Sequence, residues 1–171
     1  QNRFCEQQLF DIKSVFDEVS LKSVVLSKTG KEAVGEGKTK LTPDGILVDW
    51  DKKFVQNKYY DAVLVVGGKG SRNSIWNDPV LPQILTDHFR AGKVVGAMGL
   101  SVIALLRAGL LSRQEVSVSA GEKYVEELEE AEVYISEEPL TFNEQIVTAA
   151  GWAHGKPFGE KVLELLEFPS R

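Results

Sequence analysis

The chain has 171 residues, of which 43% are hydrophobic and 26% are charged, and this composition predicts one globular domain with its own core. Its formal net charge of -5, with lysines and arginines scattered among acids, argues against a nucleic-acid partner. No window approaches the ~18 consecutive apolar residues of a membrane span. The single cysteine, Cys5, excludes an internal disulfide and fits a reducing, cytoplasmic environment.

The first part of the chain predicts a helix, a strand and an irregular region. Residues 9–18 place Leu9, Ile12, Val15 and Phe16 on one stripe of an amphipathic helix. Residues 23–27 form a short apolar run that predicts a strand. Residues 29–45 are rich in glycine, lysine and threonine, which is typical of short strands and loops at a sheet edge.

The middle of the chain alternates between apolar runs and helical patterns. Residues 60–66 form a nearly continuous apolar run, which predicts a strand covered on both faces by helices. A helix begins at the capping sequence Asn77-Asp78-Pro79 and stops at Ala91-Gly92. A strand over residues 94–97 and a second helix ending at Ala108-Gly109 follow at once.

The last part of the chain continues this alternation. Residues 116–119 predict a strand, and residues 122–131 predict a helix whose acidic residues form a solvated face. Residues 133–135 and 145–149 predict strands around a polar turn at Asn143-Glu144, and residues 158–168 predict the closing helix. The whole pattern indicates one α/β domain over residues 1–171: a three-layer αβα sandwich with a mostly parallel, flavodoxin-like sheet.

The segment Lys93–Leu106 is the most informative stretch. An apolar strand pattern passes directly into an apolar helical pattern at a glycine, which predicts a strand-to-helix elbow at the carboxyl edge of the sheet. Such an elbow commonly displays a nucleophile. The residue expected at its apex is Gly99, which has no side chain to react with.

Several other residues carry groups that could take part in chemistry. His154 follows a strand at the edge where ligand crevices open, and Cys5 is a packing residue or a reactive thiol. Ser101 begins the elbow helix, whose N-terminus favours developing anions. His88 reads as an ordinary residue of an amphipathic helix. Two histidines without a nearby carboxylate or cysteine pattern predict no metal site.

Three segments, Tyr60–Gly68, Gly92–Ala97 and Ala108–Leu111, occur in the order and spacing of the ThiJ/PfpI superfamily. The chain resembles that superfamily from Phe4 to its final helix. The superfamily includes intracellular proteases, the parkinsonism-linked deglycase and chaperone proteins, and relatives of the class I glutamine amidotransferases. The resemblance implies a homodimer and requires no cofactor.

The resemblance also implies a reaction for which this chain lacks the groups. In the superfamily, a cysteine at the elbow faces a glutamate from the first helix, often with a histidine after the next strand. These positions fall on Gly99, Gln8 and Ser119. Glycine removes the nucleophile, and glutamine cannot share a proton with a thiolate. Members of the superfamily also begin with an apolar central strand before the segment matching Asn2–Gln8, so we expect an N-terminal strand that this sequence omits.

Two classes of function follow. The first is a non-catalytic domain that binds a ligand or a protein partner, or acts in regulation, through a crevice. Its expected residues are Gly67, Gly68, Gly99, Leu100, Gly151, Trp152 and His154. The second is a divergent hydrolase, glyoxalase or deglycase that uses Cys5, Ser101 or His154 as its working group. A weaker third reading is a flavin- or nucleotide-binding domain, because a crevice of this kind is general to such sheets.

Overall fold

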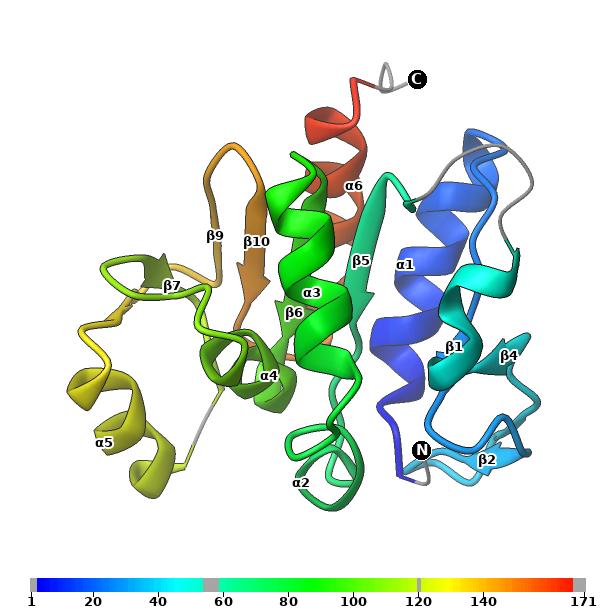
Figure 1. Ribbon diagram of the computed structural model, residues 1–171, viewed down its shortest axis with the longest axis horizontal. Coiled ribbons are helices and arrows are strands. Elements are labelled where there is room, and N and C mark those ends of the chain that lie inside the picture. Colours follow the sequence, from blue (N-terminus) through cyan, green and yellow to red (C-terminus); the bar gives the residue numbers. More distant parts are fainter. Residues whose placement is uncertain (1–2, 54–58, 120, 168–171) are drawn as a thin grey trace.

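The computed structural model describes residues 3–53, 59–119 and 121–167, in which helices and strands alternate (Figure 1). The helices are α1 (Glu6–Glu18), α2 (Ser71–Ser74), α3 (Leu81–Arg90), α4 (Val102–Arg107), α5 (Glu122–Glu130) and α6 (Gly155–Leu165), with 3-10 turns η1 (Leu47–Lys53), η2 (Gly99–Ser101) and η3 (Trp152–His154). The strands are β1 (Leu26–Ser27), β2 (Ala33–Val34), β3 (Lys40–Leu41), β4 (Gly45–Ile46), β5 (Ala62–Val65), β6 (Val94–Met98), β7 (Glu115–Val116), β8 (Tyr134–Ile135), β9 (Leu140–Phe142) and β10 (Ile146–Ala149).

The main sheet has the strand order β5-β6-β10-β9. Strand β6 pairs in parallel with β5 and with β10, in a register that places Val95 opposite Val63 and Ile146. Strand β9 closes the sheet as an antiparallel neighbour of β10. Smaller pairs lie beside this sheet: β1 with β4 and β7 with β8 in parallel, and β2 with β3 antiparallel.

Helices cover both faces of the main sheet, as Figure 1 shows with α3 in front of it and α6 behind it. All of β6 is buried, and its alternate side chains belong to different clusters. Val95 and Ala97 pack with residues of α3 and α4, whereas Val94 and Met98 pack with residues of α1 and α6. This alternation confirms the predicted α/β sandwich with a mostly parallel sheet.

Several predicted elements are confirmed with shifted ends. Helix α1 begins three residues before Leu9, and the predicted cap of α3 is present because Asp78 Oδ1 accepts hydrogen bonds from the N–H groups of Val80 and Leu81, at 2.9 and 3.1 Å. Helix α6 begins at Gly155 rather than Phe158, because a proline is tolerated in the first turn of a helix. Residue 168, the predicted end of that helix, lies outside the described residues.

The turn predicted at Asn143-Glu144 is present, but the strand directly before it, β9, is one that the sequence did not predict. The partner of β10 is β9, and the predicted strand 133–135 instead contributes β8, which pairs with β7. Asn143 Oδ1 accepts hydrogen bonds from the N–H groups of Gln145 and Ile146, at 2.9 and 2.7 Å, and so fixes a tight turn. A tight turn selects the residues immediately before it as the partner strand. The strand predicted at 116–119 is likewise displaced to Glu115–Val116.

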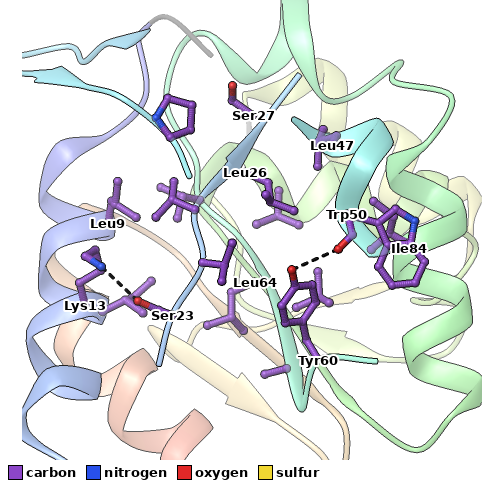
Figure 2. Close-up of a pocket in the computed structure, with 18 of the residues that line it drawn as sticks. Leu9, Lys13, Ser23, Leu26, Ser27, Leu47, Trp50, Tyr60, Leu64 and Ile84 are labelled. Atoms are coloured by element: carbon purple, nitrogen blue, oxygen red, sulfur yellow. Dashed lines mark hydrogen bonds between the residues drawn. The ribbon is translucent and has the colours of Figure 1, made fainter. Parts of the chain in front are cut away.

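Two strand predictions near the start of the chain are also wrong in part. Residues 23–27 form a ladder only at Leu26–Ser27. Strand β5, expected to be covered on both faces, keeps Ala62, Val63 and Leu64 half-buried, and only Val65 is buried. Both segments border the same apolar groove (Figure 2).

Candidate functional site

The elbow is present where the sequence predicts it. Strand β6 ends at Met98, Gly99 follows with φ of +54°, and η2 leads directly into α4. A positive φ of this size is the left-handed region, which costs a residue with a Cβ about 1–2 kcal/mol. Glycine therefore adopts the apex conformation without strain, and the site has no side chain at this position.

Gln8 lies beside the apex. Its side chain is 3% exposed, and its Oε1 accepts a buried 2.8 Å hydrogen bond from the N–H of Gly67. A Cβ added at Gly99 would lie 3.3 Å from Gln8 Nε2 and 3.7 Å from the Ala150 carbonyl oxygen. A side chain at position 99 would thus point between Gln8 and Ala150, and the sequence-based placement of Gln8 next to the elbow agrees with this geometry.

The glycines after β5 make room for the start of the chain. A Cβ at Gly68 would collide with the Arg3 carbonyl oxygen and lie 2.6 Å from the Cys5 nitrogen. A Cβ at Gly67 would lie 2.6 Å from the Met98 carbonyl oxygen. The N–H of Cys5 donates to the Gly67 carbonyl at 2.9 Å, so the backbone of residues 3–5 crosses the end of β5 here.

Cys5 is half-buried next to this crossing. Burial raises the pKa of its thiol above the ordinary value, and the negative charges of Glu36 and Glu6 act in the same direction. Hydrogen bonds from the backbone of Gln8 and Gln7 oppose this effect. A thiol with a raised pKa stays protonated at neutral pH and is a poor nucleophile.

Ser101 is fully buried and its hydroxyl is already used within the fold. Its Oγ donates to the Val66 carbonyl at 2.9 Å and lies 3.1 Å from Ser71 Oγ. These contacts tie the elbow helix to the end of β5 and to α2. Sequence reasoning missed Ser71, although its position directly after Gly67–Gly70 could have indicated that it lies near the elbow.

The loop after β10 carries three of the residues that the sequence predicts for the crevice. Trp152 is 66% exposed, whereas His154 and Gly151 are half-buried. The N–H of His154 donates to the Gly151 carbonyl at 3.3 Å, which closes the η3 turn. Leu100 is half-buried at the elbow itself.

Ser119 differs from its neighbour Ser117. Ser119 is exposed after β7, whereas Ser117 is fully buried. The N–H of Ser117 donates to Thr148 Oγ1 at 2.9 Å, and its Oγ donates to the Glu138 carbonyl at 2.7 Å. The described residues contain no group of three or more histidine, cysteine, aspartate or glutamate side chains that could hold a metal ion. None of the helices in the described ranges is both long and apolar enough to span a bilayer.

The burial and the contacts of His88 differ most from what the sequence predicts. It is completely buried, and its ring lies between aromatic neighbours, with ring centroids 5.1 Å from Trp50 and 6.0 Å from Tyr60. Its Nε2 accepts a hydrogen bond from the N–H of Tyr60 at 3.1 Å, and its Nδ1 lies 2.7 Å from the Ile84 carbonyl oxygen. His88 thus fixes the start of β5 against α3, away from the elbow.

Known sequences are similar to nearly the whole of this chain. The sequence profile of the DJ-1/PfpI family matches residues 2–165. The uncharacterized protein MJ0967 of Methanocaldococcus jannaschii is 30% identical over 164 residues, which cover 96% of this chain and 78% of that protein. The glutathione-independent glyoxalase DJR-1.2 of Caenorhabditis elegans is 23% identical over 126 residues, which cover 74% of this chain and 66% of the enzyme.

Solved structures agree on the fold. A ThiJ/PfpI domain protein from Brachyspira murdochii superimposes with a TM-score of 0.86 at 23% identity, covering 99% of this chain and 93% of the other. Drosophila melanogaster DJ-1beta superimposes with a TM-score of 0.84 at 16% identity, covering 98% and 87%. Likeness at these identities concerns the arrangement of helices and strands.

Proposed function

This chain belongs to the DJ-1/PfpI family, and we propose that it is a member that binds a ligand or a protein partner, or acts in regulation, without cysteine-dependent catalysis. The observation that carries this proposal is Gly99. The backbone of the elbow is present, yet its apex carries no side chain that could act as a nucleophile.

The neighbouring side chain supports the same proposal. An amide can hydrogen-bond but cannot exchange a proton with a thiolate at neutral pH. Because Gln8 Oε1 accepts the N–H of Gly67, its Nε2 is the end that lies nearest the space above Gly99. An N–H donor in that place favours a ligand with a carbonyl or carboxylate acceptor.

The remaining hydroxyl and thiol groups do not replace the missing nucleophile. Ser101 is buried and bonded to the Val66 carbonyl, and burial keeps the Cys5 thiol protonated. The crevice between Gly99 and the Gly151–His154 loop is therefore proposed as a binding crevice, with the exposed Trp152 at its outer part.

A thiol introduced at the apex tests this proposal. The variant Cys5→Ser/Gly99→Cys has a single thiol, so its pKa can be followed by alkylation rate against pH. We expect a pKa near the ordinary ~8.5, because Gln8 provides neither a positive charge nor an acidic proton that would stabilise the thiolate. We expect no turnover of methylglyoxal. A thiol pKa several units lower together with turnover would show that the site still supports the reaction.

A second candidate function is a divergent glyoxalase that uses Cys5, and the similarity to the nematode glyoxalase favours it. This function requires the Cys5 thiolate to form despite the burial and the acidic neighbours that raise its pKa. Alkylation of the wild-type protein decides the matter, since Cys5 is its only cysteine. A titration midpoint above ~8.5 removes this candidate, whereas a midpoint well below 7 would favour it.

A further inference from the structure

A cluster of aromatic and arginine side chains joins α2, α4 and α5, which lie next to one another in Figure 1. At its centre is Trp76, whose side chain is 3% exposed. The Trp76 ring packs against the ring of Tyr124 on α5, with the centroids 4.6 Å apart and the planes at 75°. Arg72 of α2 and Arg107, the last residue of α4, complete the cluster. The cluster shares no residue with the proposed binding crevice.

Two guanidinium groups lie against the single indole ring of Trp76. The Cζ of Arg72 is 5.7 Å from the ring centroid, and the Cζ of Arg107 is 5.5 Å from it. The Arg72 Cζ is also 5.2 Å from the centroid of the Tyr124 ring. Each distance is within the ~6 Å over which an aromatic face attracts a cation. The rings carry no net charge, so the two positive charges still need anions.

Within the described residues, only Arg107 has an anionic partner. Its Nε and Nη2 lie 3.2 and 3.5 Å from the two carboxylate oxygens of Glu127, and its Nη1 donates to Asn77 Oδ1. Arg72 is exposed, and none of the ion pairs in the described part of the chain includes it. The guanidinium of Arg72 is therefore available to bind an anion.

The indole N–H of Trp76 is a second donor without a partner. Among the residues that the structure describes, Trp76 Nε1 is the single buried side-chain nitrogen or oxygen that makes no hydrogen bond. Contact between an N–H and an aromatic face is weaker than a hydrogen bond to oxygen, so the ring of Tyr124 does not replace an oxygen acceptor. An unpaired buried donor is costly and often marks the place of a missing ion or ligand.

The number of donors favours a phosphate group over a carboxylate. One guanidinium binds both oxygens of a carboxylate, as Arg107 does with Glu127. A phosphate group has three strong acceptor oxygens and nearly two negative charges, so it takes donors from several directions. Arginine has five N–H groups, and the contacts of Arg107 with Glu127 and Asn77 use three of them. The others, together with Arg72 and the Trp76 N–H, match the oxygens of a phosphate.

We propose that Arg72, Arg107 and the indole N–H of Trp76 form a binding site for a phosphate group, between α2, α4 and α5. The exposed side chain of Arg72 rotates away from the ring as it binds the phosphate. Arg107 donates its remaining N–H groups while it stays paired with Glu127, and Trp76 gains the acceptor that its N–H lacks. Because α4 begins at Val102 and ends at Arg107, the site lies at the opposite end of this helix from the elbow.

Two-dimensional ¹H–¹⁵N NMR tests the proposal, because each of the three tryptophans gives one indole N–H signal. The signal that Trp76→Phe removes belongs to Trp76. Titration with inorganic phosphate and with glycerol 3-phosphate, at constant ionic strength, should shift this signal saturably downfield and leave those of Trp50 and Trp152 in place. Saturation at a lower concentration of glycerol 3-phosphate indicates a phosphate ester as the ligand, and the reverse order indicates the free ion.

Two matched variants locate the binding at the cluster. Arg72→Gln should raise the dissociation constant at least about tenfold, because it removes a charged donor from the site. Arg90→Gln removes the same charge from the exposed end of α3 and should change the constant less than about twofold, because exposed distant charges are screened by salt.

Three results would overturn the proposal. The first is the lack of a saturable shift of the Trp76 signal with either phosphate compound. The second is an equal shift with acetate or chloride at the same ionic strength, which indicates an effect of anions in general. The third is an equal loss of affinity in Arg72→Gln and Arg90→Gln, which indicates that only the net charge of the protein matters.

Discussion

Gln8 is the residue on which the geometry of the elbow depends most directly. Its buried side chain joins α1 to the end of β5, and its amide nitrogen lies 3.3 Å from the position that a Cβ at Gly99 would take. The side chain of the neighbouring Gln7 is exposed, and its Nε2 donates a 2.7 Å hydrogen bond to Asp11 Oδ1 on the same helix. The side chain of Gln8 thus connects α1 to the end of β5, whereas the side chain of Gln7 lies on the surface of α1.

The variant Gln8→Ala should lower the free energy of unfolding by about 1–3 kcal/mol, because it leaves the buried N–H of Gly67 without an acceptor. The matched control Gln7→Ala should change it by no more than about 0.5 kcal/mol. Urea denaturation measures both. Equal effects of the two substitutions would contradict the role assigned to Gln8.

His88 gives the protein a predictable response to acid. Burial lowers its pKa below the ordinary 6.5, although the hydrogen bond to Ile84 and the charge of Asp87 act in the opposite direction. The unfolded chain therefore takes up this proton at a higher pH than the folded chain. The free energy of unfolding should be level above about pH 7 and should fall as the pH drops below about 6.5.

Denaturation midpoints measured between about pH 7.5 and 5.5 test this expectation. The variant His88→Gln should lose most of the fall over this range, whereas His154→Gln should keep it because the buried imidazole remains. A fall of the same size in His88→Gln would mean that another group causes it.

At the scale of elements, the contact between α1 and α6 is close enough to reverse the usual effect of a glycine substitution. A Cβ at Gly155 would lie 2.6 Å from Asp11 Cβ, and a Cβ at Gly159 would lie 3.2 Å from Val15 Cβ. Replacing a helix glycine by alanine normally stabilises a protein. Here the added methyl group would push α6 away from α1.

We expect Gly155→Ala to lower the free energy of unfolding by about 1–3 kcal/mol through overpacking. The exposed neighbour Lys156 provides the control, since Lys156→Ala should remain within about 0.5 kcal/mol of the wild type. Thermal and urea unfolding measure both. An increase in stability for Gly155→Ala would show that the two helices separate at little cost.

Some of these elements could be predicted from the sequence, and others could not. The elbow was predictable because one apolar run meets another at a glycine, and the caps of α3 were predictable because Asp78 precedes a proline. The pairing of β9 with β10 was not, because apolar content alone does not choose between two nearby strands. The burial of His88 depends on Trp50 and Tyr60, which only the fold brings together.

For the molecule as a whole, we propose self-association, which the family resemblance implies. Trp152 is 66% exposed, and large exposed aromatic side chains are common at interfaces. Sedimentation velocity should give a mass twice that of one chain, and Trp152→Ser should shift the distribution toward the monomer. Lys156→Ser is the control on the same surface region. A single-chain mass at every concentration would contradict the proposal.

For the whole molecule, we propose that the fold is retained while the reaction at the elbow is lost. Methylglyoxal consumption by the purified wild-type protein tests it most directly, with Cys5→Ser as the matched variant. We predict that both proteins consume methylglyoxal no faster than buffer, because Gly99 provides no nucleophile and Cys5 stays protonated. Rapid consumption by the wild type that Cys5→Ser abolishes would contradict the account.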